Sequence, residues 1–525
     1  MSPTPLTAKL DESAIDALFA DLDQGRCPGV ALAVAIDGVP VYRKGFGLAN
    51  MELPVLLGPT MRMRIGSTTK HFAALAFMLL CEEGLASIDD PIGKYVPDLH
   101  PVSREVTIRQ LMGHTSGLRD SMTVGMMLNG HDARLTDRDL VDAYRTIDDF
   151  EFAPGTRWSY NNGGYILLTA AIEAIAGASL DDVLRTRIFE PVGMFDTMLR
   201  RWDSGFIPNS ATLHFFTPDG FTRDAMGMEI SGAGGMVSTM DDMLRWLKHM
   251  DSPVVGSAET WRLMKEPHRL TNGTSTGYGF GLITDTYRGV TTLSHGGGVM
   301  AGNSQMIKVP AAGLDISIAT NRADVSAADL ANKIIDSCVE GLGPAPRPAT
   351  GEVREGVFVS ARSGRVLKLA ALGDMQSMAL DGGPPLPLFE AEDGRLTLPP
   401  IMSFFQQEVA IGDDRVRLTE FGNEDVFEGP ASVPDASAEV REGRYRSNAA
   451  RATLEVAGEG AVELVAAGGH GRVRYRLEPI APSLWQATPA GPFAALGAIV
   501  RTGPDGSLAL TAGRMNTLMF HRVNP

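Results

Sequence analysis

Cysteine is scarce in this chain of 525 residues, which contains only Cys27, Cys81 and Cys338. The three lie far apart in the sequence, and none belongs to a Cys-x-x-Cys pair of the kind that zinc knuckles use. The spacing also gives no disulfide framework. We therefore expect three core thiols, no bound metal and no cofactor.

Long apolar runs and an excess of basic residues are also missing. The longest apolar stretches, such as residues 72–81, fall well short of a membrane span, and residues 1–10 lack the pattern of a signal peptide. The 47 basic and 63 acidic side chains give a net charge of −16, which argues against nucleic acid or an anionic membrane as the main partner. We expect a cytoplasmic protein, alone or as a homodimer, that acts on a small molecule or a short peptide.

Apolar residues make up 44% of the chain, and its length exceeds what one hydrophobic core usually organises. The most informative stretch is residues 66–70 (Gly-Ser-Thr-Thr-Lys), because apolar residues then recur at helical spacing to position 80. This pattern places Ser67 at the mouth of a helix with Lys70 one turn along on the same face, where an amine can help to ionise a hydroxyl. The alternative interpretation is a serine N-cap beside a solvated lysine.

The patterns around this helix predict an α+β domain. Two strand-like runs, 30–36 and 39–42, flank Asp37 and Gly38, which form a strong hairpin signal. Further runs at 290–294, 304–309 and 315–320 lie too close together for crossover helices, so we expect them to join the hairpin in one antiparallel sheet. Flanking helices are expected at 11–22, 165–176, 180–188, 240–247 and 327–339.

The remainder of the chain reads as β structure. Residues 341–351 have the Gly and Pro content of a linker, and short alternating stretches with Asp-Gly turns follow. The segment 353–360 recurs at 440–447, which indicates two tandem β-domains. We therefore predict a catalytic domain (1–340), a linker (341–351) and two antiparallel β-barrel domains (352–435 and 436–525).

A serine nucleophile needs a proton acceptor, a group that orients the substrate, and donors for an oxyanion. Tyr160 is a candidate acceptor if Lys70 stabilises its phenolate, and Asn162 offers an amide to the substrate. The segment 294–298 (Ser-His-Gly-Gly-Gly) ends a predicted strand, where a backbone N–H group can face the substrate. Each feature also has a structural interpretation: a turn tyrosine, a structural histidine and a glycine bulge.

Eight short motifs, in order along the chain, resemble the penicillin-recognising serine hydrolases related to class C β-lactamases. They occupy residues 66–70, 89–91, 114–117, 154–162, 189–194, 234–235, 277–281 and 295–297. With two β-domains after them, the chain is most similar to the D-aminopeptidase branch. The resemblance implies a β-lactamase-like domain, eight-stranded barrels and an acyl-enzyme on Ser67. It also implies that Lys70 and Tyr160 move protons and that Asn162, His295, Gly297 and Gly298 contact the substrate.

One departure concerns the loop that, in this branch, brings an aspartate from the third domain to the substrate amine. The corresponding stretch, residues 485–493, has no acidic residue. We expect its Trp485, Thr488 and Phe493 to cover the cleft and to select by shape. Because His295 is mostly neutral at pH 7, we also expect amides and esters to be preferred over substrates with a free carboxylate.

The sequence therefore favours a D-aminopeptidase or a D-amino-acid amidase or esterase. The alternatives are a β-lactamase-like carboxylesterase and a non-catalytic penicillin-binding-type protein. A nucleophile-elbow pattern at 273–277 and a loose dinucleotide fingerprint at 296–301 lack the flanking strand and helix that each requires.

Overall fold

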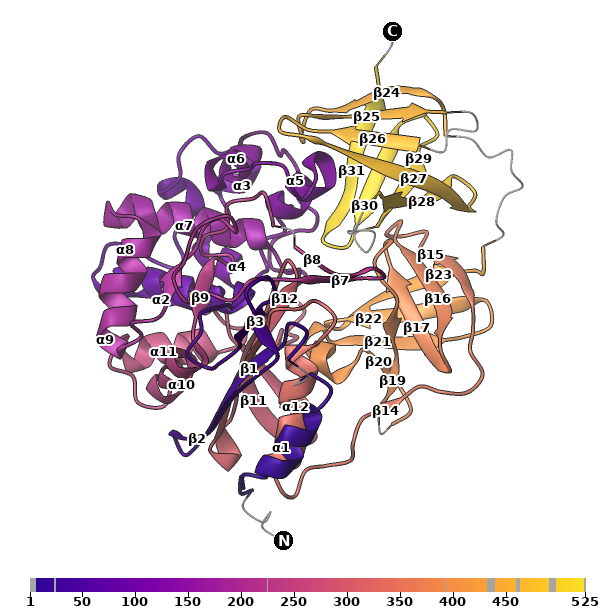
Figure 1. The fold of residues 1–525 in the computed structure, drawn as a ribbon. Coiled ribbons are helices and arrows are strands. Elements are labelled where there is room, and N and C mark those ends of the chain that lie inside the picture. The colour runs from indigo at the N-terminus through magenta and orange to yellow at the C-terminus, as the bar shows by residue number, and fades with distance from the viewer. Residues whose placement is uncertain are drawn as a thin grey trace.

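The computed structural model describes residues 6–22, 25–223, 225–391, 393–431, 440–458, 463–490 and 497–523. Figure 1 shows a large mixed lobe with two β-rich lobes beside it, the orange one following the mixed lobe in the chain and the yellow one coming last. The fold class predicted from the sequence, a β-lactamase-like α+β domain followed by antiparallel barrels, is confirmed.

The mixed lobe is built on an antiparallel sheet with the strand order β10-β11-β12-β13-β1-β2 in the described chain. These strands are β1 (Val30–Ile36), β2 (Val39–Phe46), β10 (Ile283–Tyr287), β11 (Val290–Val299), β12 (Gly302–Val309) and β13 (Leu314–Thr320). Asp37 and Gly38 have φ angles of 50° and 70°, which matches the predicted hairpin turn. Pairing of β1 with β13, from Val30 opposite Thr320 to Ile36 opposite Leu314, joins the two ends of the lobe.

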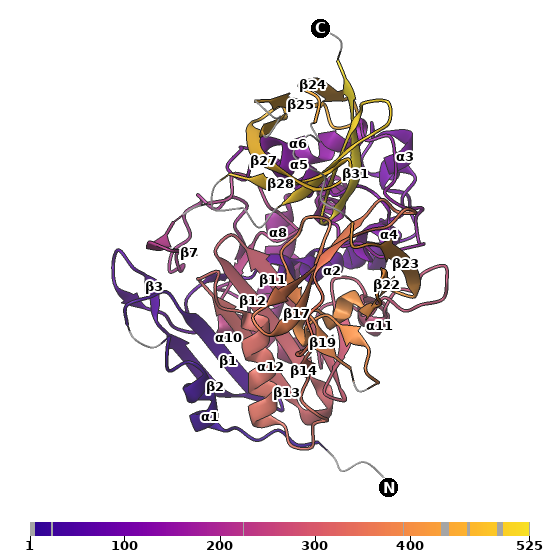
Figure 2. The ribbon, with the colours of Figure 1, turned by 90° about the vertical axis from the view of Figure 1, so that its right-hand side faces the viewer.

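Helices cover both faces of this sheet. On one face α1 (Glu12–Leu18) and α12 (Ala327–Cys338) lie against β1 and β13, as Figure 1 and Figure 2 show, and bury Ile15 and Ile334 there. On the other face lie α2 (Thr69–Glu82), α7 (Asn162–Ala176) and α10 (Met240–His249). Helix α2 is buried nearly all round, since apolar residues occupy most of its positions.

Shorter elements complete the lobe. The helices are α3 (Pro101–Arg104), α4 (Ile108–Met112), α5 (Ser121–Asn129), α6 (Asp137–Asp142), α8 (Leu180–Leu184), α9 (Glu190–Val192) and α11 (Ala258–Lys265). The small strands are β3 (Leu48–Asn50), β4 (Val55–Leu56), β5 (Met63–Arg64), β6 (Met198–Leu199), β7 (Phe215–Thr217), β8 (Gly220–Thr222) and β9 (Met236–Ser238). The helix expected at 180–188 ends at Leu184 and continues as a π-helical turn. In the described chain no single helix is long and apolar enough to cross a membrane.

The second lobe is a curled, nearly closed antiparallel sheet around Phe358, Leu367 and Phe427. Its ten described strands exceed the eight expected, because several are only two residues long. They are β14 (Arg347–Pro348), β15 (Gly356–Val359), β16 (Val366–Leu372), β17 (Met375–Leu380), β18 (Leu386–Pro387), β19 (Phe389–Glu390), β20 (Leu396–Thr397), β21 (Gln407–Ile411), β22 (Arg415–Glu420) and β23 (Asn423–Glu428). A 3₁₀ segment, η6 (Pro400–Phe405), interrupts it.

The third lobe is a closed barrel of eight strands in the described chain, as the resemblance implied. The strands are β24 (Gly443–Ser447), β25 (Ala452–Ala457), β26 (Glu463–Ala467), β27 (Arg472–Ala481), β28 (Leu484–Pro489), β29 (Ala498–Thr502), β30 (Leu508–Ala512) and β31 (Met515–Arg522). Helix α5 of the mixed lobe packs Val124, Met127 and Leu128 into the core of this barrel, and the Tyr475 hydroxyl donates to the Met127 carbonyl at 2.7 Å. The third lobe is thereby fixed against the mixed lobe.

Candidate active site

Ser67 lies in a 3₁₀ turn (Gly66–Thr68) that leads directly into α2. Gly66 has a φ of 51°, and a Cβ atom there would come within 2.9 Å of the Gly298 carbonyl oxygen, so the turn needs glycine. The Thr69 hydroxyl donates to the Gly66 carbonyl at 2.7 Å and accepts from the Met236 N–H at 3.1 Å. These contacts fix Ser67 against the end of β11, at the helix mouth predicted from the sequence.

Lys70 is completely buried beside Ser67. Its Nζ lies 3.3 Å from Ser67 Oγ, 2.8 Å from Asn162 Oδ1 and 2.6 Å from the Ala233 carbonyl oxygen. Burial lowers the pKa of Lys70 well below its usual value near 10.5, and the positive charge of Arg514 lowers it further while Asp120 opposes the shift. Burial and the Arg514 charge therefore both favour the neutral amine over the ammonium next to the serine hydroxyl.

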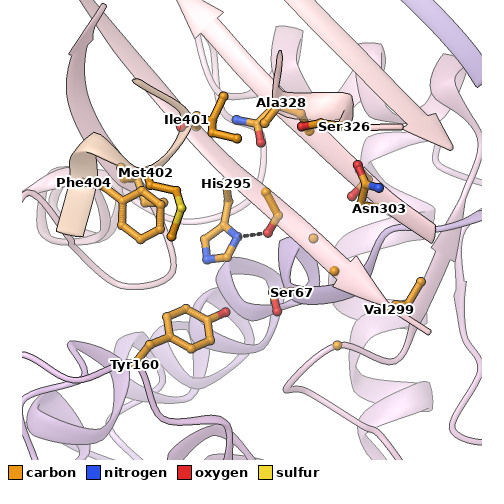
Figure 3. A pocket seen from close by; sticks show the side chains of 18 of the residues that line it. Ser67, Tyr160, His295, Val299, Asn303, Ser326, Ala328, Ile401, Met402 and Phe404 are labelled. Carbon is orange, nitrogen blue, oxygen red and sulfur yellow. Dashed lines mark hydrogen bonds between the residues drawn. The ribbon is translucent and has the colours of Figure 1, made fainter. Parts of the chain in front are cut away.

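Tyr160 and Asn162 approach the same point from the start of α7. In Figure 3 the Tyr160 hydroxyl points toward Ser67, although it makes no hydrogen bond of ordinary geometry with a described residue. Burial raises the pKa of Tyr160 well above 10, which the Ser67 hydroxyl and Arg514 offset only in part. Asn162 is the first helical residue of α7 and not a loop residue. Its Nδ2 lies 3.5 Å from Asp120 Oδ2, which leaves its Oδ1 facing Lys70.

His295 lies on β11 at the end of a hydrogen-bonded chain that fixes its tautomer. The Asn161 N–H donates to His114 Nδ1 at 3.1 Å, so His114 carries its proton on Nε2 and donates to the Tyr278 hydroxyl at 3.2 Å. Tyr278 then donates to His295 Nε2 at 3.0 Å, and His295 Nδ1 donates to the Gly296 carbonyl at 2.6 Å. Burial, with Lys70 nearby, lowers the pKa of His295 to about 3, so the ring is neutral.

The glycines after His295 let β11 run close to the serine turn. A Cβ atom on Gly297 would lie 1.9 Å from the Ile65 carbonyl oxygen, whereas a Cβ atom on Gly298 would meet no atom within 4 Å. Beyond Ser294, β11 is no longer paired with β10, so one edge of this segment faces the cleft. The predicted strand at 290–294 thus continues through the glycines to Val299.

These residues line a cleft of about 670 Å³ to which all three lobes contribute. The second lobe supplies η6, whose Ile401, Met402 and Phe404 lie across the cleft from Ser67 and Tyr160 in Figure 3. Phe404 and Phe405 pack edge-on against Trp158, which holds η6 in place. Sequence reasoning missed η6, because its contact with Trp158 joins two segments that are distant in the chain.

The third lobe supplies Arg514, from the turn between β30 and β31. Its guanidinium carbon lies 4.6 Å from the centre of the Tyr160 ring. Sequence reasoning missed Arg514 as well as Asp120 and Tyr278, because each reaches the site through contacts between distant segments.

The expected active-site loop at 485–493 is wrong for the residues that the structure describes. Trp485 and Thr488 belong to strand β28, and Trp485 is buried in the core of the third barrel, because the alternation in this stretch is that of a barrel strand. Phe493 lies outside the described residues. Within those residues, no group of three or more His, Cys, Asp and Glu side chains is arranged to hold a metal.

Comparison with known proteins places these observations in a family. Residues 15–337 match the family model described as Beta-lactamase. A D-aminopeptidase of Gluconobacter oxydans is 27% identical over 343 residues, which are 65% of this chain and 63% of that protein. A D-aminopeptidase of Brucella anthropi is 27% identical over 383 residues, 72% of each chain.

Solved structures share the fold. The octameric penicillin-binding protein homologue from Pyrococcus abyssi superimposes with a TM-score of 0.58 at 24% identity, covering 80% of this chain and all of that one. The D-amino acid amidase from Ochrobactrum anthropi SV3, complexed with L-phenylalanine amide, gives a TM-score of 0.52 at 25% identity, covering 62% of this chain and 97% of that one.

Proposed function

We propose that this chain, which belongs to the beta-lactamase family, is a serine hydrolase that cleaves amides and esters of D-amino acids through an acyl-enzyme on Ser67. The observation that carries the proposal is the position of Lys70 Nζ, 3.3 Å from Ser67 Oγ at the bottom of the cleft. The relatives named D-aminopeptidase support the substrate class.

Lys70 is the base in this proposal. A neutral amine has two N–H groups and one lone pair, and the carbonyl oxygens of Asn162 and Ala233 accept both N–H groups. The lone pair is then left for the Ser67 hydroxyl, whose proton Lys70 takes as Oγ attacks the substrate carbonyl. Asp120 supports this arrangement, because its contact with Asn162 Nδ2 keeps the amide oxygen turned toward Lys70.

Tyr160 takes a different role from the acceptor that the sequence suggested. A phenol whose pKa is raised by burial stays protonated, so its O–H group acts as a donor. Because that hydroxyl points toward Ser67, we assign it to a proton relay: Tyr160 donates its proton to the leaving group as the acyl-enzyme forms, and the Lys70 ammonium, which holds the serine proton, returns one to Tyr160. The backbone N–H groups at the mouth of α2 and on the glycine segment of β11 are the donors for the oxyanion.

A carboxylesterase is the second candidate, and the positions of the acidic residues in the cleft favour it, because neither lies where it could receive a substrate ammonium. An aminopeptidase needs an anion near the scissile bond to receive the substrate ammonium. Among the described residues that line the cleft, only Asp285 and Asp324 are acidic. Asp324 is paired with Arg322, and Asp285 lies opposite Thr292, five residues along β11 from Gly297. Neither carboxylate is beside Ser67, whereas the apolar wall of η6 suits an acyl chain.

Hydrolysis of two chromogenic substrates, one amide and one ester, tests the proposal. We expect D-alanine p-nitroanilide and p-nitrophenyl butyrate both to be cleaved, with a pre-steady-state burst on the ester, and Ser67→Ala to lower turnover by several orders of magnitude. Turnover of the ester alone would select the carboxylesterase. Absence of both burst and turnover would select a non-catalytic protein, and full activity of Ser67→Ala would refute the acyl-enzyme.

A further inference from the structure

Arg514 brings a positive charge to the cleft that no side chain among the described residues neutralises. It is the only lysine or arginine among the described residues that line the cleft, and its side chain is exposed. No carboxylate of the described chain forms an ion pair with it, although most other arginines that approach this region, such as Arg119 and Arg365, are paired. Its contact is the face of Tyr160.

The turn that carries Arg514 is clamped to the mixed lobe on its far side. Arg119 donates to the carbonyl oxygens of Asn516 and Thr517, and its guanidinium is held in turn by Asp149. The buried Glu151 carboxyl oxygen accepts the Asn516 N–H at 3.0 Å. Backbone contacts of this kind fix the position of a turn independently of its side chains. The backbone that carries Arg514 is therefore held at the edge of the cleft, which keeps the guanidinium near Tyr160.

That place is close to the reacting atoms. Arg514 and Lys70 lie 4.6 and 4.7 Å from the centre of the Tyr160 ring, and the Tyr160 hydroxyl points toward Ser67. A group bound to Arg514 would therefore lie beside the Tyr160 ring, whose hydroxyl is directed at the nucleophile. This spacing suits a substituent on the residue next to the scissile bond.

We propose that Arg514 binds a carboxylate of the substrate, so that the preferred substrates are acylated amino acids or short peptides with a free carboxylate beside the scissile bond. This inference rests on the proposed hydrolase function and names its substrate class. A guanidinium offers two parallel N–H donors that match the two oxygens of a carboxylate. The same charge repels a substrate ammonium, which is the opposite of what an aspartate at this place would do.

The inference reverses one expectation from the sequence. Neutral His295 predicts a preference for uncharged amides and esters, because the third motif supplies no cation. His295 is indeed neutral, and both of its ring nitrogens are engaged within the protein. The positive charge instead comes from a turn more than 200 residues later in the chain, which sequence motifs around Ser67 could not reveal.

The test compares the affinities of N-acetyl-D-alanyl-glycine and its C-terminal carboxamide for the full-length Ser67→Ala protein, measured by calorimetry. A charge-assisted contact predicts that the acid binds about ten- to a hundredfold more tightly than the carboxamide. Adding Arg514→Gln should bring the ratio close to one, and Arg514→Lys, which keeps the charge but not the fork, should give an intermediate ratio. Arg444→Gln, which removes an exposed arginine from β24 beside the opposite end of β31, should leave the ratio unchanged.

Two results would overturn the inference: equal affinities for acid and carboxamide, or a preference for the acid that survives Arg514→Gln. Near-ultraviolet circular dichroism checks the fold of each variant. Because the measurement uses binding and not turnover, it is independent of the acyl-enzyme. If the Ser67→Ala protein still hydrolyses the ester, the proposed function fails, and the affinity ratio still decides whether Arg514 reads a carboxylate.

Discussion

Removing the charge of Arg514 should also change the pH at which the enzyme works. Arg514 lowers the pKa of Lys70, and Lys70 must be neutral to act as the base. In Arg514→Gln the pKa of Lys70 rises, so a larger share of the amine is protonated at any given pH. The acid limb of kcat/KM should therefore move to higher pH.

The distances in the site give the size of this shift. Because the Arg514 guanidinium carbon and Lys70 Nζ each lie within 4.7 Å of one ring centre, they are at most about 9 Å apart. At an effective dielectric constant of about 20, two unit charges at this separation interact by about 1.8 kcal/mol. Screening over a Debye length of about 10 Å at 0.1 M salt reduces this to about 0.7 kcal/mol, since Arg514 is exposed. Because about 9 Å is the largest possible separation, both energies are minimum values, and they correspond to a shift of at least about 0.5 pH units with screening and about 1.3 without it.

The assay is the pH profile of kcat/KM for a neutral ester, which makes no ionic contact of its own with Arg514. Arg514→Lys keeps the charge, so its acid limb should stay near that of the wild type. Raising the salt to 1 M should move the wild-type limb toward that of Arg514→Gln. An acid limb that does not move, or that moves to lower pH, would show that Lys70 is not the titrating base or does not feel Arg514.

Three further predictions follow from other contacts. Gly297→Ala should lower the melting temperature by several degrees, because its Cβ atom would overlap the Ile65 carbonyl, whereas Gly298→Ala should melt like the wild type; equal melting of the two variants would contradict the close approach of β11 to the serine turn. Tyr278→Phe should cost about 1–3 kcal/mol of unfolding free energy, because it leaves a buried imidazole nitrogen unpaired, and ¹⁵N chemical shifts should show the His295 proton on Nδ1 in the wild type. Protonation of His295 Nε2 in those spectra would refute the chain of donors. Burial raises the pKa of Glu151 to about 8, so between about pH 4.5 and pH 8 the folded protein holds a proton that the unfolded chain has released, and stability should fall as the pH rises through this window. Glu151→Gln removes this titrating group, so the melting temperature of the variant should fall less between pH 5 and pH 8 than that of the wild type. Parallel melting-temperature curves for the two proteins would contradict the raised pKa of Glu151.

The sequence predicted the parts of this protein that depend on local patterns. Helical spacing after Gly66 placed Ser67 and Lys70 together, and the Asp37-Gly38 turn placed the hairpin that β13 later joins. What it could not predict depends on contacts between distant segments. Arg514 is one exposed arginine among many, and only the pairing of β30 with β31 and the clamp by Arg119 bring it to Tyr160. The wrong prediction for Trp485 has the same cause. Its apolar neighbours are compatible with a loop over the cleft and with a barrel strand, and only the pairing of β28 with β27 and β29 decides between them.

The residues assigned to acylation and the residues that face the rest of the substrate come from different lobes. Substrate preference can therefore change while the acylation chemistry stays the same. The groups assigned to acylation, including Lys70 and Tyr160, come from the mixed lobe and are buried and mutually hydrogen-bonded or packed. The groups that face the rest of the substrate come from η6, which packs on Trp158, and from the turn at Arg514, which packs on the ring of Tyr160. A change at either of these two segments alters what the cleft holds with little effect on the contacts of Lys70. Charge is the exception, because it acts at a distance: the cation that selects a carboxylate also depresses the pKa of the base. Substrate choice and working pH are therefore coupled through Arg514.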